Sequence, residues 1–86
     1  MGKWAKVRRR ILEGQSDQNI VFNDMLGYLR HLGFEERMRG SHHILTHSQV
    51  REILNLQPIK GGLAKGYQVK QMRSLLVFYH LGGADD

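Results

Sequence analysis

The stretch Phe34–Gln57, FEERMRGSHHILTHSQVREILNLQ, decides the fold of this chain. It holds three short runs bounded by turn residues, and these runs are Phe34–Arg39, His42–His47 and Arg51–Gln57. Gly40-Ser41 separates the first two runs and Ser48-Gln49 the last two, a spacing typical of strands joined by tight turns. Pro58 has no N–H to donate to a neighbouring strand, so it ends the third run. The sequence therefore predicts an antiparallel meander of three strands.

Helical periodicity flanks the meander on both sides. Before it, apolar residues recur every three or four positions, at Phe22, Met25, Leu26, Leu29 and Leu32. Gly33 follows, where a left-handed C-terminal cap belongs. After it, a second apolar face runs from Tyr67 onward, through Val69, Met72, Leu75, Leu76 and Tyr79. The glycine-rich segment Ile59–Gly66, which lies between the third strand and this last helix, is expected to be a mobile loop.

A further helix is predicted near the N-terminus. Trp4, Val7 and Ile11 recur at helical spacing and Gly14 supplies a stop, so Lys3–Glu13 is interpreted as a short amphipathic helix with a basic outer face. Inside the next helix, Gly27 is unfavourable by about 1 kcal/mol relative to alanine. Close packing of a neighbouring element would explain a glycine at this position.

The order helix, helix, three strands, helix predicts an α+β, two-layer domain over residues 1–86, with helices on one face of a three-stranded antiparallel sheet. Side chains alternate along a strand, so His42, Ile44 and Thr46 point one way and His43, Leu45 and His47 the other. Ile44 and Leu45 are equally apolar. The pattern therefore leaves open which of these faces is buried.

Composition restricts the class of protein. The chain has 86 residues, 41% of them hydrophobic, which permits one small core. The absence of cysteine excludes disulfides and thiolate metal sites, and makes the cytoplasm the default compartment. No apolar run approaches the roughly 20 residues of a membrane span, and no secretory signal is visible at the start. We expect a soluble protein with no membrane partner.

The formal net charge of +5 is unevenly distributed. One basic group lies at the start, at Lys3, Lys6, Arg8, Arg9 and Arg10, and another follows the last strand, at Lys60, Lys65, Lys70 and Arg73. Between Gln57 and His80 there is no acidic residue. A surface with a positive electrostatic potential attracts polyanions, above all the phosphate backbone of nucleic acids. The alternative is that these residues are only solvated surface.

The pair His42-His43 is the main candidate for chemistry, because imidazole both accepts and donates protons near neutral pH. Two other interpretations stay open. One ring could be packed and the other a plain strand residue, or His43 and His47, on one side of a strand, could bind a metal. Zinc sites usually need three or four converging ligands, and only Glu52 follows as a nearby acid.

These residues carry a resemblance to a known family. Gly40-Ser41-His42-His43-Ile44, together with Leu32-Gly33-Phe34, Leu56-Gln57-Pro58 and the segment from Lys65 to Arg73, resembles the HicA family of bacterial and archaeal toxins. The resemblance covers about residues 22–81 and implies a core like a double-stranded-RNA-binding domain. Residues 1–20 would be a helical extension that compact members lack. The ending Leu45-Thr46-His47 also departs from the family's usual aromatic and basic residues.

The resemblance further implies an mRNA interferase that cleaves RNA without metal or cofactor. Its catalytic histidine would be His42, with His43 as the alternative, taking a proton from a ribose 2′-hydroxyl. Gly40 and Ser41 would form the RNA-binding turn, and the developing charge would be stabilised by cations among Lys60, Lys65, Lys70 and Arg73. An antitoxin of the HicB family would silence the enzyme and would make the only contact with DNA. The alternative function is a non-catalytic RNA-binding module that uses the same basic face.

Overall fold

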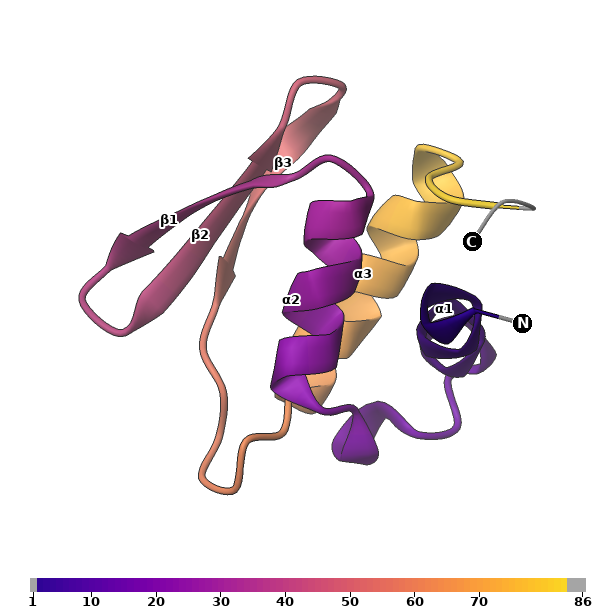
Figure 1. Ribbon diagram of the computed structural model, residues 1–86, viewed down its shortest axis with the longest axis horizontal. Coiled ribbons are helices and arrows are strands. Elements are labelled where there is room, and N and C mark those ends of the chain that lie inside the picture. Colours follow the sequence, from indigo (N-terminus) through magenta and orange to yellow (C-terminus); the bar gives the residue numbers. More distant parts are fainter. Residues whose placement is uncertain (1, 84–86) are drawn as a thin grey trace.

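A computed structural model describes residues 2–83, and its elements follow the predicted order (Figure 1). These elements are α1 (Lys3–Glu13), a 3-10 turn (Asp17–Asn19), α2 (Phe22–His31), β1 (Glu35–Arg39), β2 (His42–His47), β3 (Val50–Leu56) and α3 (Gly66–Phe78). The described chain is thus α+β, with three α-helices and one three-stranded antiparallel sheet. Every predicted element begins within one residue of its expected start, and the helix expected from Tyr67 begins at Gly66.

The sheet has strand order β1-β2-β3, as a meander requires. Arg39 pairs with His42 across the first turn, and Ile44 pairs with Asn55 on the other side of β2. The register shifts between Leu45 and His47, where the β2–β3 ladder is irregular. At the first turn Gly40 has φ of 61°, a left-handed conformation that residues with a Cβ rarely adopt. The turn before His42 therefore depends on glycine for its backbone geometry.

Burial settles which face of the sheet packs on the helices. Leu45 and Leu54 are fully buried, whereas Ile53 is 62% exposed. Since side chains alternate, His43 shares the helix-facing side with Leu45, and His42 shares the open side with Ile44. The helices α2 and α3 lie along one side of the sheet in Figure 1. Within residues 2–83 no helix covers the opposite face of the sheet, as the two-layer arrangement predicted.

The N-terminal helix belongs to the same core. α1 lies against α2 and α3, on the side away from the sheet (Figure 1). Its Val7 and Ile11 are buried, and its Trp4 ring stacks on Tyr28 at a centroid distance of 6.0 Å. A Cβ added at Gly27 would lie 2.5 Å from Cη2 of Trp4, closer than such atoms approach. The predicted close packing at Gly27 is confirmed, and Trp4 is the residue responsible.

The loop between β3 and α3 is more ordered than its glycines predicted. Val21 and Leu63 form an isolated β-bridge. The backbone N–H of Phe22 donates to Gly62 at 2.9 Å, and that of Ala64 donates to Ile20 at 2.8 Å. These bonds tie the second half of the loop to the segment that enters α2. The start of α3 is consequently held in a defined place beside the sheet.

None of the helices within residues 2–83 is both long and apolar enough to cross a lipid bilayer.

Candidate functional site

His42 lines a depression between the sheet and the start of α3. This depression has a volume of about 280 Å³ and is lined by His42, Asn55, Gln57, Lys65, Tyr67 and Gln68. His42 is the first residue of β2, Asn55 lies in β3 and Gln57 directly follows it. Lys65 directly precedes α3, and Tyr67 and Gln68 lie in its first turn. Of the residues predicted for the site, the structure brings His42 and Lys65 together here.

A chain of amide groups holds the parts of this depression in place. Gln68 is only 1% exposed, and in the amide orientation that satisfies both of its polar atoms it donates to the carbonyl of Gln57 at 3.2 Å and accepts from its N–H at 3.1 Å. Gln57 in turn donates from Nε2 to Oγ of Ser41 at 2.8 Å. The first turn of α3, the end of β3 and the turn before His42 are therefore linked. Through this bond Gln57 connects the turn that contains Ser41 to the end of β3.

The His42 ring has a partner on the adjacent strand. Its Nδ1 lies 2.8 Å from Oδ1 of Asn55. Asn55 sits between the fully buried Leu54 and Leu56, so the backbone that carries its amide is fixed by the core. The sequence analysis did not identify Asn55. Strand alternation separates Asn55 from its two leucine neighbours, but only the register of β2 and β3, in which Ile44 pairs with Asn55, places it on the same face as His42.

Arginines from β1 extend the site across the sheet. Arg39 is directly opposite His42 in the register, and directly opposed side chains lie on one face with their Cβ atoms about 5 Å apart. A second depression, of about 550 Å³, is lined by Arg37, Met38, Arg39, Ile44, Ile53 and Asn55. Asn55 borders both depressions, so they adjoin. His42 therefore lies between Arg39 on one side and Lys65 on the other.

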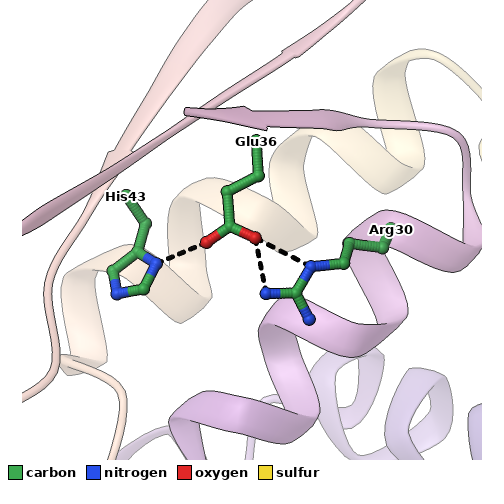
Figure 2. Close-up of polar contacts among 3 residues, drawn as sticks. All are labelled: Arg30, Glu36 and His43. Atoms are coloured by element: carbon green, nitrogen blue, oxygen red, sulfur yellow. Dashed lines mark hydrogen bonds and ion pairs between the residues drawn. The ribbon is translucent and has the colours of Figure 1, made fainter. Parts of the chain in front are cut away.

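His43 lies on the opposite face of the same strand. Figure 2 shows its Nδ1 directed at Glu36, which also binds Arg30 of α2. The Nδ1–Oε2 distance is 2.5 Å, and Arg30 donates from Nε to Oε1 at 2.7 Å. The ring also packs edge-on against Phe22, and its side chain is only 21% exposed. His43 thus joins the sheet to α2 and does not line the depression around His42.

The contacts of Glu36 have an electrostatic consequence. The pKa of Glu36 is lowered, mainly by its hydrogen bond to His43 and further by Arg30. Partial burial of the carboxyl group acts in the opposite direction. A carboxyl group whose pKa is lowered by folding stabilises the native state above its unfolded pKa of about 4.3, and this contribution is lost as the pH falls through the lower folded value.

Replacing Glu36 by glutamine is therefore expected to lower the free energy of unfolding at pH 7 by about 2 kcal/mol, since charged hydrogen bonds are lost. Near pH 3 the difference between variant and wild type should shrink, because protonation already removes the same charge. Urea denaturation at both pH values measures this. Glu35→Gln, at the exposed neighbouring carboxylate, is the control and should change stability by less than about 0.5 kcal/mol. Equal losses for Glu36→Gln at both pH values would contradict the assignment.

His47 also has partners within the fold. Its Nε2 donates to the carbonyl of Leu32 at 3.1 Å, and its Nδ1 accepts from the backbone N–H of Gln49 at 3.0 Å. The His43 and His47 rings are thus each bound to other groups. Within residues 2–83 no cluster of three or more histidine, cysteine, aspartate or glutamate side chains is arranged to hold a metal ion.

The other predicted cations lie elsewhere. Arg73 donates from Nη1 and Nη2 to the two carboxylate oxygens of Asp17 at 2.9 and 3.0 Å, and from Nη1 to the carbonyl of Ile11 at 2.9 Å. This bonding lowers the pKa of Asp17. Lys70 is exposed on α3, where its charge acts on the same Asp17, and Lys60 is exposed in the turn after β3. Arg73 therefore connects α3 to the N-terminal segment, and we omit it from the site.

Several residues of the N-terminal basic group also bind the chain itself. Lys3 lies 3.3 Å from Asp24, and Arg8 donates to the carbonyl of Leu81 at 3.2 Å. Arg10 donates to the carbonyl of Asn19 at 3.4 Å. These contacts favour a structural part for α1 over a polyanion-binding one.

The sequence analysis missed five residues of the candidate site. Arg39 lies opposite His42 in the sheet, and four residues line the depression with it, namely Asn55, Gln57, Tyr67 and Gln68. For Arg39 a signal existed, since a two-residue turn at Gly40-Ser41 places it opposite His42. For Gln68 the sequence holds no such signal, because a glutamine in a helical pattern does not indicate that its amide will be buried against a strand.

Comparisons of the chain with protein-family models, with curated proteins and with solved structures find no match.

Proposed function

We propose that this protein is an endoribonuclease that cleaves mRNA with His42 as general base, as the resemblance to HicA toxins implies. The observation that carries the proposal is the convergence of His42 and Lys65 in one depression, with Arg39 opposite His42 in the sheet. An imidazole between cations is the arrangement that cleavage of a phosphodiester by its neighbouring hydroxyl needs.

In the proposed reaction His42 takes the proton of a ribose 2′-hydroxyl while that oxygen attacks the adjacent phosphorus. The O2′–P bond forms and the P–O5′ bond breaks, which leaves a 2′,3′-cyclic phosphate, and the departing 5′-oxygen takes a proton from water to become a 5′-hydroxyl. Lys65 and Arg39 stabilise the negative charge that grows on the phosphoryl oxygens. The N-terminal end of α3, where the helix dipole is positive, borders the same depression and favours the phosphate further.

The order of elements from α2 to α3 agrees with the fold that the resemblance implies, that of a double-stranded-RNA-binding domain. Such domains contact phosphates and 2′-hydroxyls and recognise RNA mainly by shape. The open sheet face, with Arg37 and Arg39 beside Ile44 and Ile53, is the surface we assign to RNA. A HicB-type antitoxin would silence the enzyme in the cytoplasm by covering this face, and contact with DNA would be made by the antitoxin.

The test is to incubate the purified protein with a transcript, with and without EDTA, and to analyse the ends of the products. We expect cleavage in EDTA that yields cyclic phosphate and 5′-hydroxyl ends. A matched oligonucleotide with 2′-deoxyribose at the cleaved position should stay intact. Salt-dependent RNA binding without any cleavage would favour the alternative, a non-catalytic RNA-binding module.

Lys65→Ala is expected to lower the cleavage rate about tenfold or more, because one of the cations beside the phosphate is lost. Lys70→Ala is the matched control, since it removes the same charge from an exposed position of α3 that lies outside the depression. Rates at saturating RNA separate this effect from weaker binding. Equal losses for both variants would mean that Lys65 contributes only to the general charge.

A further inference from the structure

We propose that Asn55 is a positioning residue, which holds the ring proton of His42 on Nδ1 and so directs the lone pair of Nε2 to the substrate. This inference rests on the proposed function of His42. Its basis is the 2.8 Å contact between His42 Nδ1 and Asn55 Oδ1. An amide oxygen only accepts hydrogen bonds, so the ring nitrogen that faces it must carry the proton.

The position of the proton decides whether the ring can act as a base. A neutral imidazole has one protonated nitrogen and one with a lone pair, and the hydrogen bond made by one nitrogen selects the state of the other. Free histidine prefers its proton on Nε2, which would leave the lone pair on Nδ1, facing the protein. The bond to Asn55 selects the opposite form.

The surroundings of Asn55 suit it for this purpose. It lies in β3 between two fully buried leucines and pairs with Ile44 in the ladder, so its backbone cannot move away from β2. Its side chain borders both depressions, the one lined by His42 and the one lined by Arg39. As an amide it orients the ring without adding a negative charge, whereas a carboxylate at this place would repel the phosphates of an RNA strand.

The direct test is the tautomer of His42, read from the ¹⁵N chemical shifts of its ring by NMR at a pH where the ring is neutral. We expect the Nδ1–H form in the wild type and in Asn55→Asp, which keeps an acceptor oxygen. Asn55→Leu should shift the population toward Nε2–H. Asn23→Leu, at an exposed asparagine of α2, is the matched control and should leave the His42 signals unchanged.

Kinetics supply a second measurement. Asn55→Leu should lower kcat by about 2- to 10-fold, the range expected for the loss of one neutral hydrogen bond, with KM nearly unchanged. Asn55→Asp should keep kcat near the wild-type value and raise KM, because the new carboxylate repels RNA. Amide spectra of each variant show whether it is folded.

The inference is overturned if His42 keeps the Nδ1–H form in folded Asn55→Leu, if the wild type has the Nε2–H form, or if Asn55→Asp lowers kcat as much as Asn55→Leu. Failure of the proposed function looks different. In that case the wild type does not cleave RNA, or His42→Ala cleaves it as fast as the wild type. The NMR measurement of the tautomer is independent of either result.

Discussion

His42→Ala is expected to lower the rate of RNA cleavage by about 100- to 10,000-fold, the usual contribution of a general base, while RNA binding is largely retained. The imidazole is the only group that we assign to proton removal, whereas binding is shared among several cations. Because His42 is exposed at the first position of β2, its truncation leaves no cavity in the core. The variant should therefore fold and be as stable as the wild type.

Single-turnover cleavage and equilibrium binding of the same transcript measure the two effects separately. His80→Asn is the control: it removes another exposed imidazole at the far end of α3, about 20 Å along the helix, and asparagine tolerates the positive φ of 54° there. His43→Ala should lose stability through Glu36 and keep cleavage wherever it is folded. The proposal would be falsified by undiminished cleavage in His42→Ala, or by full loss in a folded His43→Ala.

Ile11→Ala is expected to lower the free energy of unfolding by about 2–5 kcal/mol, the cost of truncating a large core side chain. Ile11 is 0% exposed although it lies in the N-terminal helix. Its carbonyl also accepts a hydrogen bond from Arg73, so a shift of α1 would disturb the Arg73–Asp17 pair as well. Native proteins typically have a free energy of unfolding of about 5–15 kcal/mol, so this loss would be a large fraction of the total.

Chemical denaturation followed by tryptophan fluorescence measures the loss, because Trp4 of the same helix stacks on Tyr28. Lys6→Ala, on the exposed side of α1, is the control and should change stability by less than about 0.5 kcal/mol. If Ile11→Ala were as stable as the wild type, α1 would be an appendage that the core does not need.

The secondary structure was predictable because its signals are local. The apolar period of α2 and the stop at Gly33 mark a helix whatever lies around it, and the turn residues at 40–41 and 48–49 delimit the strands. The packing of α1 was only partly predictable. Its apolar stripe indicated a buried face, but that Trp4 would fill the space left by Gly27 depends on how two helices cross.

The sequence suggested the chemistry that we propose for the candidate site, but it did not indicate which residues would lie around His42. The pair His42-His43 beside a glycine turn pointed to proton transfer, and the acid-free segment after β3 pointed to phosphate. Arg73 belonged to the same basic run as Lys65, yet it binds Asp17, a residue 56 positions away. Cations that are close in sequence are equally good candidates for binding phosphate, whereas in the folded chain each of them has different neighbours.

By itself, the sequence determined the order of the elements, the turn at Gly40-Ser41, and the alternation that sends His42 and His43 to opposite faces. Only the tertiary structure decided which face is covered by helices, and hence that His43 binds Glu36 while His42 meets Asn55 and Lys65. The physical reason is that backbone periodicity depends on neighbours along the chain. Burial instead depends on which apolar surfaces meet in space, and Ile44 and Leu45 are apolar enough for either outcome.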